Sequence, residues 1–108
     1  MIILGVDPGI ATTGYCFLSK SGNKLEAIEI GAIITSPKDE PHTRLLQIYN
    51  EIDRLIDLHK PDSIATERLF FSKNEKTALI VGRTIGVVLL LAAQHGLPWT
   101  EYTPMQVK

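Results

Sequence analysis

The first nine residues constrain the fold more strongly than any other stretch of this sequence. Residues 2–6 form a short run rich in β-branched side chains, and Asp7, Pro8 and Gly9 follow at once. Such a run is typical of a central strand buried on both faces, and Pro-Gly favours a sharp turn. A carboxylate at the end of a buried strand is costly unless it is paired, hydrogen-bonded or bound to a metal. Asp7 is therefore either a turn residue or a ligand.

The remaining elements predict an α/β domain with a mixed five-stranded sheet. Strand-like segments at 14–19 and 25–35, joined by Ser21-Gly22-Asn23, continue the first strand as an antiparallel meander. A helix over 42–59, a strand at 63–66, a second helix over 74–94 and a fifth strand at 98–103 then follow. The first helix is expected to bury one face and to leave a polar one that includes Arg44; the inner face comprises Leu45, Tyr49, Ile52, Leu55, Ile56 and His59.

The second predicted helix is apolar nearly all round over 87–93. Such a helix is covered on two sides, one of which would be the sheet. Gly82 and Gly86 leave a smooth surface that suits either a partner subunit or close packing on its own sheet.

Length, charge and cysteine content narrow the class of protein. The 108 residues suit a single domain, and the lone Cys16 excludes an internal disulfide framework and fits a reducing cytoplasm. The longest apolar run, 85–93, is too short to cross a bilayer, so no membrane association is expected. The net charge of −1 divides into −3 over residues 1–66 and +2 over 67–108. The basic excess after residue 66 is either a chance surface distribution or a surface for phosphates.

Two acidic residues share one sequence context. Asp7 follows Ile-Leu-Gly-Val and Glu67 follows Ser-Ile-Ala-Thr, so each ends an apolar strand. If the two strands are central and adjacent, the carboxylates meet at one edge of the sheet. Carboxylate oxygens are the ligands that Mg²⁺ prefers, and paired ions of this kind activate water for phosphodiester hydrolysis. The pair favours the ligand interpretation of Asp7 over the turn interpretation.

Three segments, in order along the whole chain, resemble the RuvC family of crossover (Holliday) junction endonucleases. They are Asp7-Pro8-Gly9 followed by Thr13-Gly14-Tyr15, the segment Ala65-Thr66-Glu67-Arg68-Leu69-Phe70-Phe71-Ser72-Lys73-Asn74, and Gln106-Val107-Lys108. The resemblance implies an RNase H-like nuclease domain over 1–108. It further implies a cytoplasmic homodimer that nicks four-way junction DNA symmetrically in recombination and repair, and that cooperates with the branch-migration complex RuvA–RuvB.

By match of position, the resemblance makes Asp7 and Glu67 catalytic ligands of Mg²⁺, with two ions per site in the complete protein and Mn²⁺ as a substitute. Phe70, with Phe71, would stack on bases at the crossover, and Lys108 would meet the backbone near the cleavage site. Basic side chains that can neutralise phosphates are Lys73, Lys76 and Arg83. Each of these three also suits an ordinary solvated helix face, and one of the two phenylalanines also suits the core.

The sequence departs from the family pattern at its C-terminal end. The family's site uses further acidic residues on a final helix, and no Asp or Glu follows Glu101 here. We therefore expect a C-terminally incomplete domain that cleaves poorly or not at all by itself.

Two alternatives remain open at this point. The first is a non-catalytic, dimerising DNA-binding module of the same fold. The second is a fragment of an actin-like or sugar-kinase-like ATP-binding protein, since those proteins also open with a strand, an acidic residue and a Gly-Thr turn.

Overall fold

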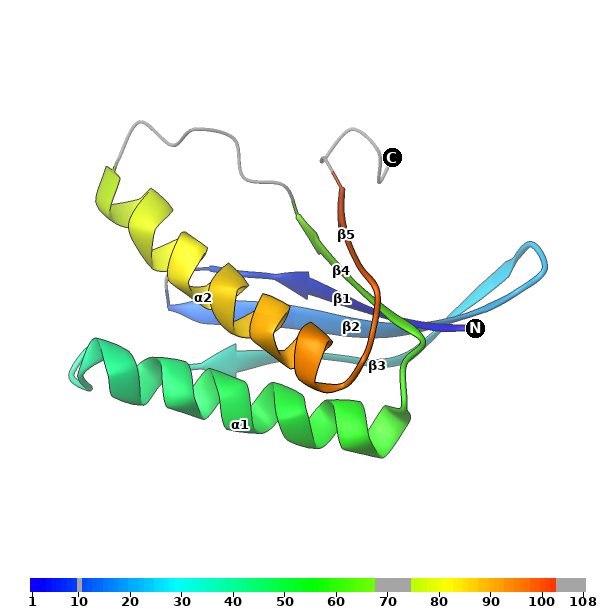
Figure 1. The fold of residues 1–108 in the computed structure, drawn as a ribbon, viewed down its shortest axis with the longest axis horizontal. Helices are drawn as coiled ribbons and strands as arrows, with labels where there is room; N and C mark the ends of the chain where they lie inside the picture. The colour runs from blue at the N-terminus through cyan, green and yellow to red at the C-terminus, as the bar shows by residue number, and fades with distance from the viewer. Residues whose placement is uncertain (10, 68–74, 103–108) are drawn as a thin grey trace.

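The computed structural model describes residues 1–9, 11–67 and 75–102, which form one five-stranded sheet and two helices (Figure 1). The elements in chain order are β1 (Ile2–Asp7), β2 (Thr12–Ser21), β3 (Lys24–Ile34), α1 (Pro41–His59), β4 (Ser63–Glu67), α2 (Glu75–Gln94) and β5 (Trp99–Tyr102). Every element predicted from the sequence is present, with ends that differ by a few residues.

The sheet is mixed, as predicted. Its strand order is β3-β2-β1-β4-β5. The meander β3-β2-β1 is antiparallel, whereas β4 lies parallel to β1 and β5 lies parallel to β4. The turn between β2 and β3 places Gly22 at φ 63°, a backbone conformation that glycine adopts without steric cost. Because β1 and β4 are central neighbours, the two strands that end in Asp7 and Glu67 lie side by side.

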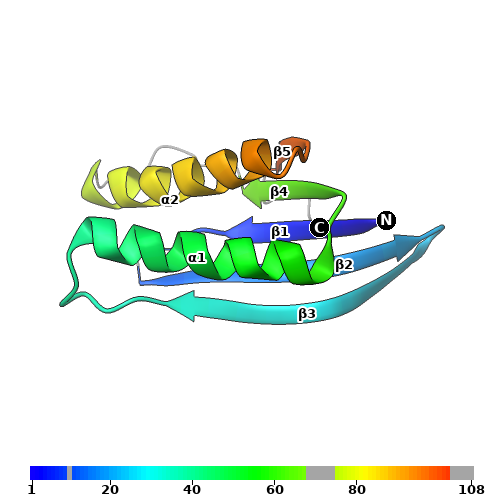
Figure 2. The same cartoon turned by 60° about the horizontal axis from the view of Figure 1, so that its bottom comes forward.

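Both helices lie on the same face of the sheet (Figure 2). Pro41 occupies the first turn of α1, where its missing N–H costs no hydrogen bond, and Lys60 ends the helix in the left-handed conformation. Gly96, at φ 66°, follows α2, and the N–H of Leu97 returns to the carbonyl of Ala92. Of the described helices, none is long and apolar enough to span a membrane.

The core fills the space between the helices and the sheet. Leu4, Val6, Phe17 and Ile64 supply its floor, and all four are at most 1% exposed. From α1 come Ile48, Ile52, Leu55 and Ile56. The predicted inner face of this helix omitted Ile48, which is buried, and included Leu45, Tyr49 and His59, which are only half-buried. The buried stripe is therefore narrower and rotated relative to the prediction.

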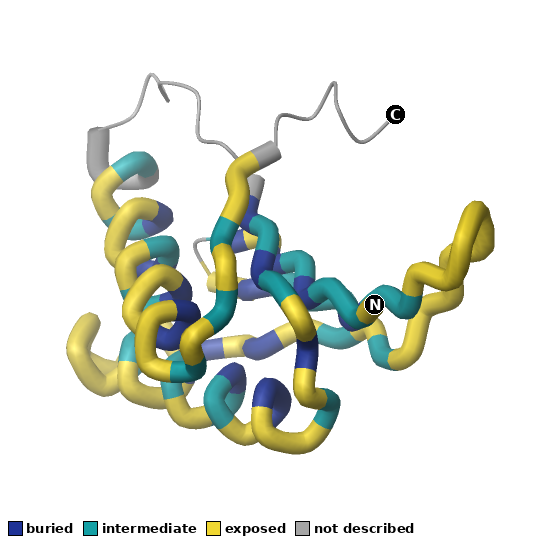
Figure 3. The backbone as a smooth tube through the Cα atoms, turned by 45° about the vertical axis from the view of Figure 1, so that its right-hand side comes forward, coloured by how far each residue is buried: buried dark blue, intermediate teal, exposed yellow. Residues whose placement is uncertain are grey.

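The opposite face of the sheet is open among the described residues. Ile30 and Ile34 of β3 stand on it with exposed fractions of 72% and 70%. Figure 3 shows the β2–β3 hairpin reaching beyond the other strands with an exposed tip. An apolar sheet face without a covering layer is unusual, because sheets normally bury their apolar faces.

Candidate functional site

Asp7 is the last residue of β1 and its carboxylate is exposed. Strand residues alternate between faces, so Leu4 and Val6 point into the core and Asp7 stands on the open face. Within the described part of the chain, no group donates a hydrogen bond or forms an ion pair with this carboxylate. An unpartnered carboxylate at a strand end is available to a ligand, which a turn-forming aspartate is not.

Strand register places the backbone of Glu67 beside that of Asp7. In the parallel pair of β1 and β4, Val6 lies opposite Thr66. Asp7 and Glu67 are the next residue in each strand, so the two reach the same level at the same edge of the sheet. A joint site requires the strands that end in Asp7 and Glu67 to be neighbours, and the backbone register confirms that they are.

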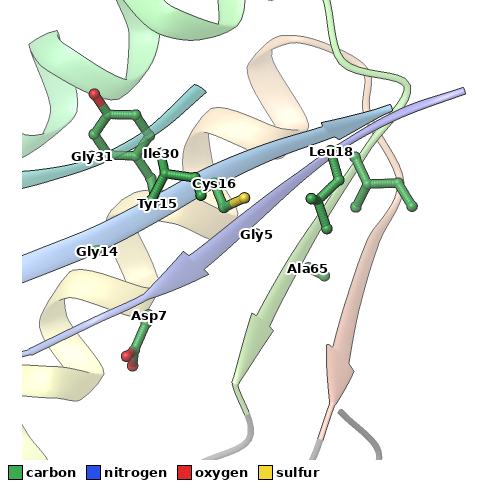
Figure 4. A pocket seen from close by; sticks show the side chains of 10 residues that line it. Gly5, Asp7, Gly14, Tyr15, Cys16, Leu18, Ile30, Gly31 and Ala65 are labelled. Atoms are coloured by element: carbon green, nitrogen blue, oxygen red, sulfur yellow. The ribbon is translucent and has the colours of Figure 1, made fainter. Parts of the chain in front are cut away.

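A shallow cavity of about 450 Å³ lies on the open face next to Asp7 (Figure 4). Three small residues around Asp7 leave this space: Gly14 lies directly opposite Asp7 on β2, Gly5 precedes Asp7 on the same face, and Ala65 lies opposite Gly5 on β4. Cys16 also lines the cavity, and burial raises the pKa of its thiol, which keeps it uncharged. A larger side chain at Gly5, Gly14 or Ala65 would fill the approach to the carboxylate.

The turn after Asp7 depends on glycine. A Cβ atom at Gly9 would collide with the carbonyl oxygen of Thr12, so no larger residue fits while the turn keeps its shape. The backbone of Gly9 therefore lies close to that of Thr12, next to the end of β1 where Asp7 stands. Gly9 is thus required because the two backbones lie so close together. From the Pro-Gly pair the sequence predicts a sharp turn, but not this contact.

The strand that carries Glu67 is fixed from the other side by β5. The indole Nε1–H of Trp99 donates a hydrogen bond to Oγ1 of Thr66 at 2.9 Å. Thr66 is 0% exposed, and the half-buried Trp99 packs against the core as its sequence position indicated. This contact secures the residue that immediately precedes Glu67.

The DNA-contact residues predicted from the sequence are mostly beyond what the structure describes. Phe70, Phe71, Lys73 and Lys108 lie outside the described residues. Lys76 is placed on the first turn of α2 by its backbone alone. Arg83 is described, and it is exposed at the wall of a cavity between α1 and α2. No described group of three or more His, Cys, Asp or Glu side chains is arranged to hold a metal.

Sequence reasoning missed Arg44. The helical pattern places it on the polar face of the first helix, but its side chain is half-buried and its Nε donates to Oγ1 of Thr35 at 2.8 Å. Thr35 and Arg83 share the same cavity wall with it. No signal in the sequence links these positions, because only the docking of both helices onto the sheet brings them together.

The sheet joins an antiparallel meander to two parallel strands, and acidic residues end its neighbouring inner strands β1 and β4. This arrangement defines an RNase H-like domain. Comparison with solved structures agrees. The chain superposes on Thermus thermophilus RuvC in complex with Holliday junction substrate with a TM-score of 0.94 and 30% identity, covering 100% of this chain and 69% of that one. The yeast mitochondrial Holliday junction resolvase Ydc2, at a TM-score of 0.64 and 20% identity, shares the fold.

The family model for crossover junction endodeoxyribonuclease RuvC matches residues 3–108, and the chain belongs to the RuvC family. RuvC of Pelotomaculum thermopropionicum is 49% identical over 108 residues, which are 100% of this chain and 66% of the relative. The chain thus spans slightly less than two thirds of the length of that curated relative. Family membership confirms the resemblance and favours the nuclease interpretation over an ATP-binding fragment.

Proposed function

We propose that this chain carries part of the active site of a structure-specific endonuclease that resolves four-way DNA junctions. The observation that supports this most directly is the register of β1 and β4, which brings the strand ends of Asp7 and Glu67 to one level. Membership of a family named for crossover junction cleavage supplies the reaction class. The junction-bound Thermus relative has the same fold over the whole of this chain.

Asp7 and Glu67 are the residues that would hold divalent metal. The donor set fits Mg²⁺, or Mn²⁺ in its place, because both ligands are hard carboxylate oxygens and Asp7 has no competing described partner. When bound, a pair of such ions supplies activation of water and stabilisation of the leaving oxygen. The chain's own contribution is to bring the strand ends of Asp7 and Glu67 to one level of the sheet edge, and to keep the approach to Asp7 open through Gly5, Gly14 and Ala65.

A direct test uses two proteins, the 108-residue chain and the same chain extended by the C-terminal third of the Pelotomaculum relative. We expect both to bind a synthetic four-way junction in preference to duplex DNA, and only the extended protein to nick it efficiently in Mg²⁺. In the extended protein Asp7→Asn should abolish nicking and retain junction binding, because a neutral amide is a poor ligand for Mg²⁺. The matched control Asp39→Asn, in the exposed loop before α1, should nick normally.

Three results would contradict the proposal. If the extended protein binds duplex as tightly as the junction, the substrate assignment is wrong. If it binds the junction and never nicks, or if Asp7→Asn nicks like the parent, the catalytic assignment is wrong. Junction binding without any nicking would instead support a non-catalytic DNA-binding module.

The open sheet face supports the proposal that this chain carries only part of the active site. It exposes Ile30, Ile34 and the apolar wall of the cavity beside Asp7. The curated relative is longer than this chain by about a third of its own length. A segment equivalent to that third would bury these side chains, and it would bring further groups to the edge where Asp7 stands. Covering an apolar sheet face is the ordinary way in which a sheet is stabilised.

The outward face of α2 supports a homodimer. Leu79 and Leu90 are 56% and 52% exposed on it, and a Cβ atom at Gly82 or Gly86 would meet nothing within 4 Å. A smooth apolar stripe of this kind suits a second copy of the same helix. Together these residues define a surface on which two helices can approach closely.

Sedimentation analysis tests the dimer. Leu90→Gln should shift the protein toward monomer, whereas Leu58→Gln, which changes a leucine 61% exposed on α1, should leave the dimer intact. Both substitutions replace an exposed apolar side chain, so the two monomers should be folded equally by circular dichroism. Equal dimer dissociation constants for the two variants would place the interface elsewhere.

A further inference from the structure

A small cavity between α1 and α2 is lined by a mixture of basic, hydroxyl and apolar side chains. Its volume is about 110 Å³, which suits a single phosphate group and is too small for a nucleoside. The polar lining consists of two arginines and two threonines, and the apolar lining consists of aliphatic residues and a proline: Thr35, Arg44, Arg83, Thr84, Pro41, Leu45, Ile48 and Ile80. None of the described residues in this lining is acidic.

The polar groups are held in place by the fold. Thr35 and Thr84 are 5% and 2% exposed, so their hydroxyls have fixed surroundings. Arg44 is oriented by its 2.8 Å hydrogen bond to Thr35, whereas Arg83 reaches the same cavity from α2. A guanidinium presents planar N–H donors that match phosphate oxygens. The aliphatic lining lowers the local dielectric and strengthens attraction for an anion.

The cavity lies at the end of the molecule where Asp7 stands. Thr35 directly follows β3, and its N–H donates to the carbonyl of Ala11 at 3.2 Å. Ala11 belongs to the connection that leaves Asp7 and enters β2. A nucleic acid strand passing the Asp7 edge would therefore run close to this cavity on the helix side of the sheet.

We propose that Arg44 and Arg83, with Thr35 and Thr84, form a phosphate-binding pocket that takes one backbone phosphate of the bound DNA. The pocket extends the DNA-binding surface from the Asp7 edge onto the helical layer. The assignment of DNA as the source of the phosphate rests on the proposed nuclease function. The pocket's affinity for a phosphate group rests only on the geometry of its lining.

Junction binding measured over a series of salt concentrations tests the DNA assignment. Arg83→Gln should weaken binding about fivefold at roughly 0.1 M salt and should reduce the slope of log affinity against log salt by about 0.9, the value for one lost phosphate contact. Arg83→Lys should restore part of the affinity. The control Arg54→Gln removes an arginine that pairs with Glu51 near the other end of α1, and it should leave both quantities unchanged.

Inorganic phosphate titrated into the free protein tests the pocket independently of DNA. Amide resonances of Thr35 and Thr84 should shift with saturable binding in the parent protein, and the shifts should be lost in Arg83→Gln. Saturating junction DNA should prevent added phosphate from causing any further shift. Absence of saturable shifts in the parent would overturn the pocket. Saturable shifts combined with unchanged junction binding in Arg83→Gln would assign the pocket to free phosphate and overturn the DNA source.

Failure of the proposed nuclease function can be distinguished from failure of the phosphate pocket. A parent protein that does not prefer the junction over duplex would contradict the nuclease assignment, while the phosphate titration would still decide the pocket. Thermal unfolding of Arg83→Gln should give the same midpoint as the parent protein, because this side chain is exposed. A selective drop in Arg83→Gln would show a structural role and count against the pocket.

Discussion

Replacing Thr66 by valine isolates the contact that secures the strand end before Glu67. Valine has nearly the same shape as threonine, and it removes only the hydroxyl that accepts the indole N–H of Trp99 at 2.9 Å. Thr66 is 0% exposed, whereas Trp99 is half-buried. Leaving a buried donor without a partner costs about 1–3 kcal/mol, and partial access to water puts Trp99 in the lower half of that range.

We therefore expect Thr66→Val to lower the free energy of unfolding by about 1–2 kcal/mol. For a domain of this size, the thermal midpoint should fall by about 4–8 °C. Trp99→Phe removes the same donor together with part of a large apolar side chain, and it should cost at least as much. The double variant should cost less than the sum of the two, by about 1 kcal/mol, because both single changes break one shared bond.

Urea unfolding followed by far-UV circular dichroism measures all four proteins with one probe. Trp99 is the only tryptophan, so fluorescence of the parent and of Thr66→Val additionally reports on β5. Thr84→Val is the control, because this threonine is also buried and its hydroxyl donates to the carbonyl of Ile80 on its own helix, at 3.4 Å. It should cost less than about 0.5 kcal/mol.

Additive costs for Thr66→Val and Trp99→Phe would refute the reasoning, since two residues that share one bond cannot act independently. A cost for Thr84→Val as large as that for Thr66→Val would show that any buried hydroxyl has the same effect, and that the bridge to β5 has no special role.

Three further outcomes follow from other contacts. Gly31→Ala should cost about 1–3 kcal/mol in urea unfolding, because its Cβ would lie 2.6 Å from Cζ of Tyr15 and displace the ring. The hydrogen bonds that Glu29 accepts from His59 and Tyr15 hold the pKa of its carboxyl below its ordinary value. Ionised Glu29 should therefore stabilise the fold above the ordinary pKa of a glutamate, and this stabilisation should be lost as the pH falls through the lowered pKa. Glu29→Gln should abolish this pH dependence of the free energy of unfolding. Ile30→Lys should leave the stability of this chain within about 0.5 kcal/mol and impair nicking by the extended protein, because only there would the open face be covered.

Most of the architecture could be predicted from the sequence because local patterns determine it. Apolar alternation, turn residues and helical period mark each element, and the acidic residues at the ends of the first and fourth strands mark the candidate site. Each of these signals lies within a few consecutive residues. The strand order that makes β1 and β4 neighbours agrees with the expectation that two matching strand ends share one edge.

The features that escaped prediction depend on contacts between distant elements. Arg44 follows Thr35 by nine residues and precedes Arg83 by thirty-nine, and only the packing of α1 and α2 on one face brings the three together. Likewise the bond between Trp99 and Thr66 requires β5 to lie beside β4. Ile48 is a different case, because it lies one turn before Ile52 on the same stripe and helical period includes it, although the predicted inner face left it out.

The position of the candidate site follows from the parity of a single strand. Leu4 and Val6 are 1% exposed because they face the helices, so the odd positions of β1 must face the other way. Asp7 therefore emerges on the one face that the described helices leave open, at the end where the parallel neighbour β4 also ends. A slip of one residue in the register would turn Asp7 into the core, where its charge would be unpaired. The same buried side chains that stabilise the sheet thus determine on which face the carboxylate can act.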